Sequence, residues 1–485
     1  MLRIGLASAI YALAVSALLG CSGDSASPPL PERPNIVLYV IDTLRADRLG
    51  VYGYDEHTSP NIDELAASGV VFDSASAAAP WTLPSVSSLF LSQLSCEHGV
   101  TIDRDRIAAD ARPLALILKE LGYETASFHA NPYAGKMSGL DMGFDVARLV
   151  KQGALEDAVG AWLGARERDP FFLYVHTVEP HNPELALDRF IEPRGFVSED
   201  LKREVEDAYR VYRTLTRVDY DAERPPGSTD NTDEQRVALA RLDALRGPID
   251  HLYDAMVREA DERLGRIVAS LESAGVWHNT VFILVSDHGE ELGDRGGWQH
   301  DQSLYEELVD VPFVVRFPEN AAAGRRIADP VGLIDVVPTL TEILGVEPPS
   351  SVRGRSLLPL IEGERALSTS RLSAVRHNEK KFYRPYEQTR GDLNVMMRRG
   401  QWKGIWNVEL DTLELYDLDA DPQERADVSK TEQAISEGME RFARSALEQC
   451  RERAPGSLSE SDVELDEESR RQLESLGYVN RRKSP

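Results

Sequence analysis

Five short segments of the chain are predicted to be strands, and all but the more polar second one are apolar and rich in β-branched and aromatic residues, as in strands buried on both faces. They occupy residues 35–41, 125–130, 170–176, 280–285 and 311–317. Helical patterns separate them, as at 59–69, where Ser59 and Pro60 begin a helix and Gly69 ends it. Strands that alternate with helices predict an α/β fold with a large, mainly parallel sheet sandwiched by helices.

Changes in composition and in the pattern of apolar residues divide the chain into regions. Residues 34–365 hold the predicted sheet and form the main domain, and 190–248 is a charged helical and loop insertion that we expect to lie outside the core. Residues 366–453 combine short alternating strands with a helix near 430–452, which predicts a small C-terminal α+β subdomain. Residues 454–485 are charged and are expected to form a loosely held tail.

The N-terminus has the pattern of an export signal. An apolar run at 4–19 follows a single basic residue, so 1–20 is predicted to be a signal peptide. Its end, Leu18-Leu19-Gly20-Cys21, resembles the lipobox of bacterial lipoproteins, in which the cysteine is lipidated; an ordinary cleaved signal is the alternative. Residues 21–33 are small, polar and proline-rich, as in a tether. We therefore expect an exported cell-envelope lipoprotein, facing the periplasm or on the outer surface, attached to the membrane through Cys21.

The composition restricts the partners. A net charge of −27 repels nucleic acid, so no nucleic-acid partner is expected. An anionic substrate is still possible, because a bound cation can reverse the field within one pocket. Besides Cys21 the chain has only Cys96 and Cys450. Export would permit them to pair, but the sequence leaves this open.

Polar residues follow two of the predicted strands directly. Asp42 ends the first strand, and Asp287 and His288 end the fourth. The carboxyl ends of parallel strands meet at one edge of the sheet, where α/β folds bind ligands. Two carboxylates and an imidazole suit one divalent cation, with calcium, manganese, magnesium and zinc all possible. The alternative is that these residues only cap turns.

Thr82 precedes Pro84 and a run of serines and large apolar residues, which is how a helix begins. With Thr82 as the N-cap, an anion at its hydroxyl would face free N–H groups and the positive end of a helix dipole. The alternative is a simple capping threonine. A threonine hydroxyl is a poor nucleophile by itself, and a cation held at the sheet edge would activate it.

Several collinear motifs resemble the sulfatase family of the alkaline-phosphatase superfamily. They include 35–42, the Thr82-Leu-Pro-Ser region, Glu97-His-Gly-Val100, 172–181, Ser286-Asp-His-Gly-Glu-Glu291 and 333–339, and the resemblance continues to about residue 430. It implies an alkaline-phosphatase-like sheet and a divalent metal ion. The metal ligands that it implies are Asp42, Thr82, Asp287 and His288.

The same resemblance assigns further pocket residues. His181 matches a substrate-binding histidine that could protonate the leaving oxygen, and His300 matches a position that contacts the substrate anion. Asn131 and His129 fall near other polar pocket positions of the family. Two more histidines in family motifs, His98 and His176, are expected to be structural or to support the ligands.

The chain departs from the usual sulfatase pattern at three positions. Sulfatases have Cys or Ser in place of Thr82, Arg in place of Val86 and a second acid in place of Thr43. The Cys or Ser becomes formylglycine, which threonine cannot form because its β-carbon carries a methyl group. Threonine here resembles the phosphate-handling branches, namely phosphodiesterases, phosphonate hydrolases and phosphoethanolamine or glycerophosphate transferases, which form a phospho-threonine.

These features predict a metal-dependent ester hydrolase or transferase in which Thr82 attacks a phosphate or sulfate ester. The substrate would be a sulfated or phosphorylated glycan, lipid or small molecule. One alternative is a true sulfuric ester hydrolase that uses unmodified threonine. Another is a catalytically silent lipoprotein that binds anionic glycans.

Overall fold

A computed structural model describes residues 33–101, 105–191, 197–216, 233–364, 370–377, 393–453, 466–476 and 478. The predicted signal peptide, the lipidation site Cys21 and nearly all of the tether lie outside these residues. Among the helices of the described ranges, none combines the length and the apolar character that crossing a membrane requires.

Eight strands form the main sheet in the spatial order β11, β2, β10, β7, β1, β6, β4, β5. All neighbours pair in parallel except β10, which runs antiparallel to both β7 and β2. The predicted large, mainly parallel sheet is therefore confirmed. The strand bounds are β1 Asn35–Ile41, β2 Val70–Phe72, β4 Glu124–His129, β5 Val146–Leu149, β6 Phe171–Thr177, β7 Thr280–Ser286, β10 Phe313–Arg316 and β11 Arg325–Ile327.

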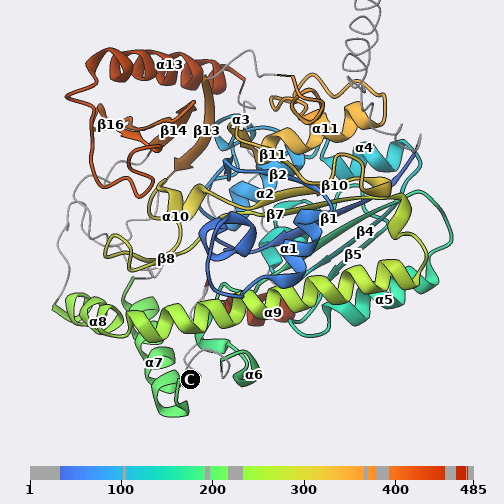
Figure 1. Ribbon diagram of the computed structural model, residues 1–485, viewed down its shortest axis with the longest axis horizontal. Coiled ribbons are helices and arrows are strands. Elements are labelled where there is room, and N and C mark those ends of the chain that lie inside the picture. The colour runs from blue at the N-terminus through green and yellow to red at the C-terminus, as the bar shows by residue number, and fades with distance from the viewer. Residues whose placement is uncertain are drawn as a thin grey trace, which may run out of the picture.

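Helices cover both faces of this sheet (Figure 1). Alternate residues of β1 separate the two cores, since Val37, Tyr39 and Ile41 face one layer and Ile36 and Leu38 face the other. The first layer contains α1 Pro60–Ala67, α5 Leu155–Ala165 and α9 Arg246–Ser273. The second contains α2 Thr82–Leu91, α4 Leu114–Glu120 and α11 Val336–Ile343.

The charged insertion contributes two helices, α7 Glu199–Thr216 and α8 Asp233–Ala244. Both pack into the first core layer, where Val205, Tyr209 and Leu242 are buried with residues of α9. The expectation that the insertion lies outside the core is therefore wrong for 199–216 and 233–244. The apolar residues Val205, Ala208 and Tyr209 of α7 are buried, and charged residues lie on the other side of this helix. The helix α8 buries Leu239 and Leu242, although its Val237 is exposed.

A second sheet, in the order β13, β14, β15, β16, forms the C-terminal subdomain and packs against α13 Gln433–Glu452 (Figure 1). Its strands are β13 Ser370–His377, β14 Leu393–Arg399, β15 Trp402–Asn407 and β16 Thr412–Asp417. Buried charges join it to the main domain: Lys403 Nζ on β15 lies 2.7 Å from Glu306 Oε1 and 2.8 Å from Glu424 Oε1. Glu306 begins α10 Glu306–Val309 of the main domain. The α+β subdomain is thus anchored to the main sheet domain.

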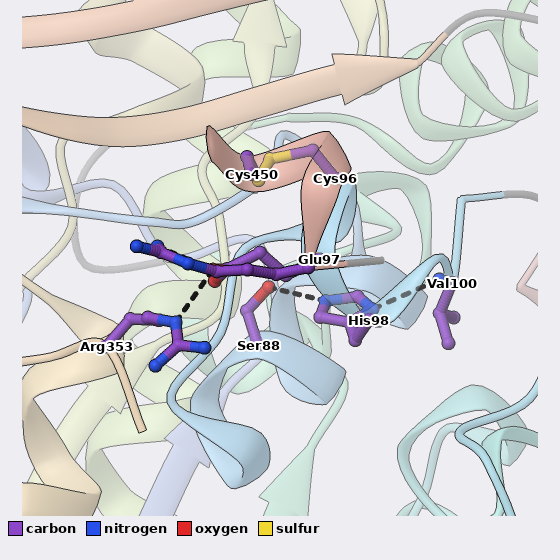
Figure 2. Close-up of a disulfide and its surroundings, with 8 residues drawn as sticks. Ser88, Cys96, Glu97, His98, Val100, Arg353 and Cys450 are labelled. Carbon is purple, nitrogen blue, oxygen red and sulfur yellow. Dashed lines mark hydrogen bonds and ion pairs between the residues drawn. A yellow bond between two sulfur atoms is a disulfide. The ribbon is translucent and has the colours of Figure 1, made fainter. Parts of the chain in front are cut away.

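A disulfide bond also links the two parts. Cys96 of α3 Ser95–His98 is bonded to Cys450 of α13, with the two Cα atoms 5.7 Å apart (Figure 2). Beside it, Glu97 pairs with Arg353, and His98 donates from Nε2 to Ser88 while Nδ1 accepts from Val100 N–H. The pairing that the sequence left open is present, and His98 is part of this structural cluster.

The tail contains a further helix, α14 Glu467–Ser475. Leu473 is fully buried, and Leu476 packs against Ala130 and Val178 beside the ends of β4 and β6. The expectation of a loosely held tail is wrong for 466–476 and Tyr478, because these apolar residues are inserted into the main domain.

Candidate active site

The strands β1 and β7 are neighbours, and the residues that follow them meet at one edge of the sheet. Ile41 pairs with Ser286, so Asp42 and Asp287 leave the sheet side by side. Ser286 fixes the two loops together, because its hydroxyl accepts from Leu44 N–H at 2.9 Å and donates to the carbonyl of His288 at 2.6 Å. The edge predicted from the sequence is therefore the place where these polar side chains gather.

Asp42, Asp287 and His288 form a buried cluster in which one ligand atom of each lies within 4.8 Å of the others. Nε2 of His288 is 3.4 Å from Asp42 Oδ1 and 3.8 Å from Asp287 Oδ2. Ligands bound to one ion at 2.1–2.4 Å are separated by roughly 3–4 Å. The spacing and the donor set fit one divalent cation, and such a buried cluster is consistent with the metal site of sulfatases.

The charges in this cluster are strongly coupled. Burial opposes the charged form of His288, but the carboxylates of Asp287 and Asp42 outweigh it and raise its pKa to about 9. Burial likewise disfavours charge on Asp42, yet the hydrogen bond with His288 and the nearby histidines hold the pKa of Asp42 well below its ordinary value. A cation bound by these atoms would compete with the proton of His288.

Thr82 is the first residue of α2, and Trp81 occupies the N-cap position. The prediction of Thr82 as the N-cap is therefore wrong by one residue. The hydroxyl of Thr82 does not cap the helix and points toward the edge of the sheet. Thr82 Oγ1 lies 3.3 Å from His288 Nε2 and 3.5 Å from Asp42 Oδ1. The threonine, both carboxylates and the imidazole that the sequence assigned to a metal are thus brought together.

Asn131 positions two of these groups. Its Oδ1 accepts from Tyr133 N–H at 3.0 Å, which caps the 3-10 helix η3 Pro132–Ala134 and fixes the orientation of the amide. Its Nδ2 then donates to Asp42 Oδ2 at 2.8 Å and to Thr82 Oγ1 at 3.3 Å. The predicted pocket residue Asn131 therefore holds the hydroxyl and the carboxylate in register.

Thr43 introduces backbone strain next to the cluster. Its φ of 57° lies in the left-handed region, which β-branched residues rarely adopt. The hydroxyl of Tyr253 donates to the carbonyl of Thr43 at 2.6 Å. The buried hydroxyl of Thr43 has no hydrogen-bond partner within the described residues. An unpaired buried oxygen beside Asp42 is a further feature that suits a bound ion.

His181 and His300 lie next to each other near Thr82, with ring centroids 4.9 Å apart. Nδ1 of His181 donates to Asn182 Oδ1 at 3.2 Å, which also accepts from Arg213 at 2.9 Å, so Nε2 points toward Thr82's pocket as an acceptor. Nδ1 of His300 lies 3.1 Å from Glu290 Oε2. Burial lowers the pKa of His181 to about 4 and that of His300 to about 3. Both predicted histidines are at the site, and both rings are neutral at pH 7.

Two other histidines lie outside the immediate surroundings of Thr82. His129 hydrogen-bonds Ser127 Oγ at 3.0 Å, and in the described parts of the chain no hydrogen bond joins it to Thr82 or to the carboxylates. His176 of β6, which is separated from β7 by β1, contacts Asp287 Oδ2 at 3.4 Å. The structure therefore places His129 apart from the cluster and places His176 where it can orient a ligand.

A family model described as "Sulfatase" matches residues 34–346, well over half of the chain. The chain belongs to the sulfatase family. A model described as "N-sulphoglucosamine sulphohydrolase, C-terminal" matches residues 293–452 of this chain. The family resemblance and the ester-hydrolase class that follows from it are confirmed.

Individual relatives are distant but cover most of the chain. An N-acetylglucosamine-6-O-sulfatase of Bacteroides thetaiotaomicron is 24% identical, with 85% of each chain covered. An arylsulfatase of Clostridium perfringens is 25% identical, covering 83% of this chain and 91% of that one. The phosphonate monoester hydrolase of Agrobacterium radiobacter has the same fold, with a TM-score of 0.65 at 22% identity over 86% and 96% of the two chains.

Two features of this candidate active site were not predicted from the sequence. The hydroxyl of Tyr478 lies 3.2 Å from Thr82 Oγ1, and Arg213 on α7 holds Asn182 behind His181. Both residues lie in segments assigned to a tail or to an insertion outside the core. The only available signal was the occurrence of Leu473, Leu476 and Tyr478 among charged residues.

The raised pKa of Glu291, on the short strand β8 Glu291–Leu292, leads to a prediction of how the stability of the fold depends on pH. Burial, together with the charge of Glu307, raises its pKa to about 8 from an ordinary 4.5. Between these values the folded chain keeps a proton that the unfolded chain has lost, so the stability decreases as the pH rises from about 4.5 to about 8. The free energy of unfolding of the Glu291→Gln variant, relative to that of the wild type, should increase by roughly 1 kcal/mol for each pH unit in this window. Urea unfolding at pH 5, 6, 7 and 8 measures the difference, and parallel profiles would contradict the prediction.

Proposed function

We propose that this sulfatase-family enzyme uses Thr82 to take a phosphoryl or sulfuryl group from an anionic ester, with phosphate and phosphonate esters preferred. The observation that carries the proposal is the position of Thr82 Oγ1, 3.3 Å from His288 Nε2 and 3.5 Å from Asp42 Oδ1. The hydroxyl also lies at the N-terminal end of α2, whose dipole favours an anion.

In the first half of the proposed reaction, Thr82 Oγ1 forms a bond to phosphorus or sulfur while the bond from that atom to the leaving oxygen breaks. The hydroxyl proton passes to solvent water. Nε2 of protonated His181 gives its proton to the leaving oxygen, and an anion bound beside this ring favours the protonated form. The product of this half is an esterified Thr82.

In the second half, water attacks the esterified group, and His181 takes a proton from the water. Thr82 leaves as the alcohol and takes a proton from solvent water, so the enzyme returns to its initial state. Asn131 keeps Thr82 and Asp42 in place throughout through its two hydrogen bonds. Asp42, Asp287, His288 and Thr82 would hold a divalent cation, which supplies positive charge that favours ionised Thr82 and offsets the charge of the ester.

The preference for phosphorus rests on the residues that replace sulfatase residues. Threonine cannot become formylglycine, and Val86, at the position of the family's arginine, is fully buried in the apolar core behind α2.

A second candidate is hydrolysis of sulfate esters by the unmodified threonine. It is favoured by the names of curated relatives, which include an N-acetylglucosamine-6-O-sulfatase and a delta 4,5-hexuronate-2-O-sulfatase. Under this alternative the substrate is a sulfated glycan.

A panel of aryl phosphate monoesters, phosphate diesters, phosphonate monoesters and sulfates, assayed with Mg²⁺, Mn²⁺, Ca²⁺ and Zn²⁺ in turn, separates the two candidates. We expect turnover of at least one phosphorus ester to exceed turnover of the matching sulfate. Intact-mass analysis of the quenched reaction should show a phosphoryl adduct that peptide mapping assigns to Thr82. Activity on sulfates alone would select the second candidate, and inactivity on every ester would reject both.

We further propose that the chain is exported and lipidated on Cys21, which supports a position at the cell envelope. The Cys96–Cys450 disulfide suits an oxidising compartment. Labelling with a fatty-acid analogue in a bacterial host should mark the wild type and not the Cys21→Ala variant. Equal labelling of the two would refute lipidation at this residue.

A further inference from the structure

Tyr478 reaches the centre of the candidate active site from the C-terminal end of the described chain. Its hydroxyl oxygen lies 3.2 Å from Thr82 Oγ1, 3.0 Å from His181 Nε2 and 3.3 Å from His300 Nε2. A phenol has one donor and two acceptor sites, so these three neighbours use its whole hydrogen-bonding capacity. The phenol is therefore seated among the groups proposed to receive the substrate anion.

The position of the phenol excludes a substrate. A reacting atom must come within about 3–3.5 Å of the nucleophile before attack. The phenol oxygen already occupies this distance from Thr82, between the two histidines that would contact the oxygens of the ester. The edge of Tyr133 packs against the ring of Tyr478 with centroids 5.0 Å apart, which holds the ring in this place.

The segment that delivers Tyr478 is short. We call residues 466–476 and 478 the C-terminal strap. Its helix α14 has 9 residues. Leu473 and Leu476 are buried, Gln472 Nε2 donates to the Val150 carbonyl at 3.1 Å and Asn182 Nδ2 donates to the Ser475 carbonyl at 3.0 Å. A short helix that packs on a larger domain can detach locally while the sheet stays folded.

We propose that the C-terminal strap is autoinhibitory: Tyr478 occupies the position of the substrate anion, and the strap must leave before an ester can reach Thr82. This inference rests on the proposed role of Thr82. The strap and an anion then compete for one site, so each lowers the affinity of the other. Access to the site is set by the equilibrium between docked and released strap.

The test measures the binding of orthovanadate to the full chain by isothermal titration calorimetry. Tyr478→Ala should bind vanadate at least ten-fold more tightly than the wild type, and Tyr478→Phe, which keeps the ring, should lie between them. Arg471→Ala is the matched control, because Arg471 is exposed on the same helix and pairs only with Glu467 among the ion pairs described. It should leave the affinity unchanged. Weaker binding to Tyr478→Ala and Tyr478→Phe would show that the phenol helps to hold the anion and would overturn the proposal.

Hydrogen exchange on the wild type gives a second measurement that needs no variant. Vanadate should accelerate exchange of the α14 amides, because the bound anion keeps the strap released; slower or unchanged exchange would overturn the proposal. The two proposals fail separately. If Tyr478→Ala binds vanadate more tightly but no ester is hydrolysed, the autoinhibitory role of the strap is supported and the proposed function is rejected. If hydrolysis depends on Thr82 but the vanadate affinities are equal, the proposed function is supported and the autoinhibitory role is rejected.

Discussion

Replacing Thr82 with alanine is expected to lower kcat/KM for the preferred ester by about 10⁴-fold, because the nucleophile is removed. Thr82→Ser keeps the hydroxyl in the first turn of α2 and should stay within about ten-fold of the wild type. The measurement is steady-state turnover of the best ester from the substrate panel, with intact-mass analysis for the adduct. The adduct should be absent from the alanine variant.

Ser87→Ala is the matched control for this experiment. Ser87 lies on the same helix, and its hydroxyl donates to the Leu83 carbonyl at 2.7 Å, away from the metal cluster. Its loss should leave kcat/KM unchanged within two-fold or so. If Thr82→Ala keeps more than about a tenth of wild-type activity, another group is the nucleophile and the proposed mechanism fails.

Asp287→Asn is expected to remove the bound cation and to lower kcat/KM by about 10³-fold or more, since a metal ligand and its charge are both lost. Asp287 contributes Oδ2 to the cluster, 3.8 Å from His288 Nε2, while its Oδ1 accepts from His288 N–H at 3.0 Å. Elemental analysis of the purified protein should find about one divalent cation per wild-type chain and far less in the variant.

Asp261→Asn serves as the control for burial of a carboxylate. Asp261 lies on α9 and is buried against the start of α1, where it accepts from Ile62 N–H at 2.8 Å and from Asn61 Nδ2 at 2.6 Å. This variant should lose stability but keep its cation. Equal metal content in the wild type and Asp287→Asn would exclude Asp287 as a ligand.

The sheet and the core of the candidate site were predictable because both depend on local pattern. Continuous apolar runs indicated buried strands, and the run at 35–41 coincides with β1. Because strands of a parallel sheet end at a common edge, Asp42 and Asp287 could be placed together before their loops were known. His181 and His300 came only from the family resemblance, since nothing in their own surroundings indicates a shared pocket.

Local pattern failed where long-range packing decides. The insertion was placed outside the core because its helices are highly charged, yet Tyr209 and Leu242 are buried against α9. Thr82 was assigned as a helix cap, whereas contacts with Asp42 and His288 turn its hydroxyl away from the helix. His129 is the last residue of β4 and lies inside the predicted strand; its ring bonds Ser127, and within the described residues no hydrogen bond joins it to Thr82.

The sequence by itself determined the α/β sheet, the edge where the acids gather and the membership of the sulfatase family. These follow from the alternation of strands and helices and from motifs whose residues are close in the chain. Only the tertiary structure decided which side chains meet Thr82, above all Tyr478, which is separated from it by 396 residues. Contacts over such a distance leave no periodic trace in the sequence, because they depend on the positions of every element between them.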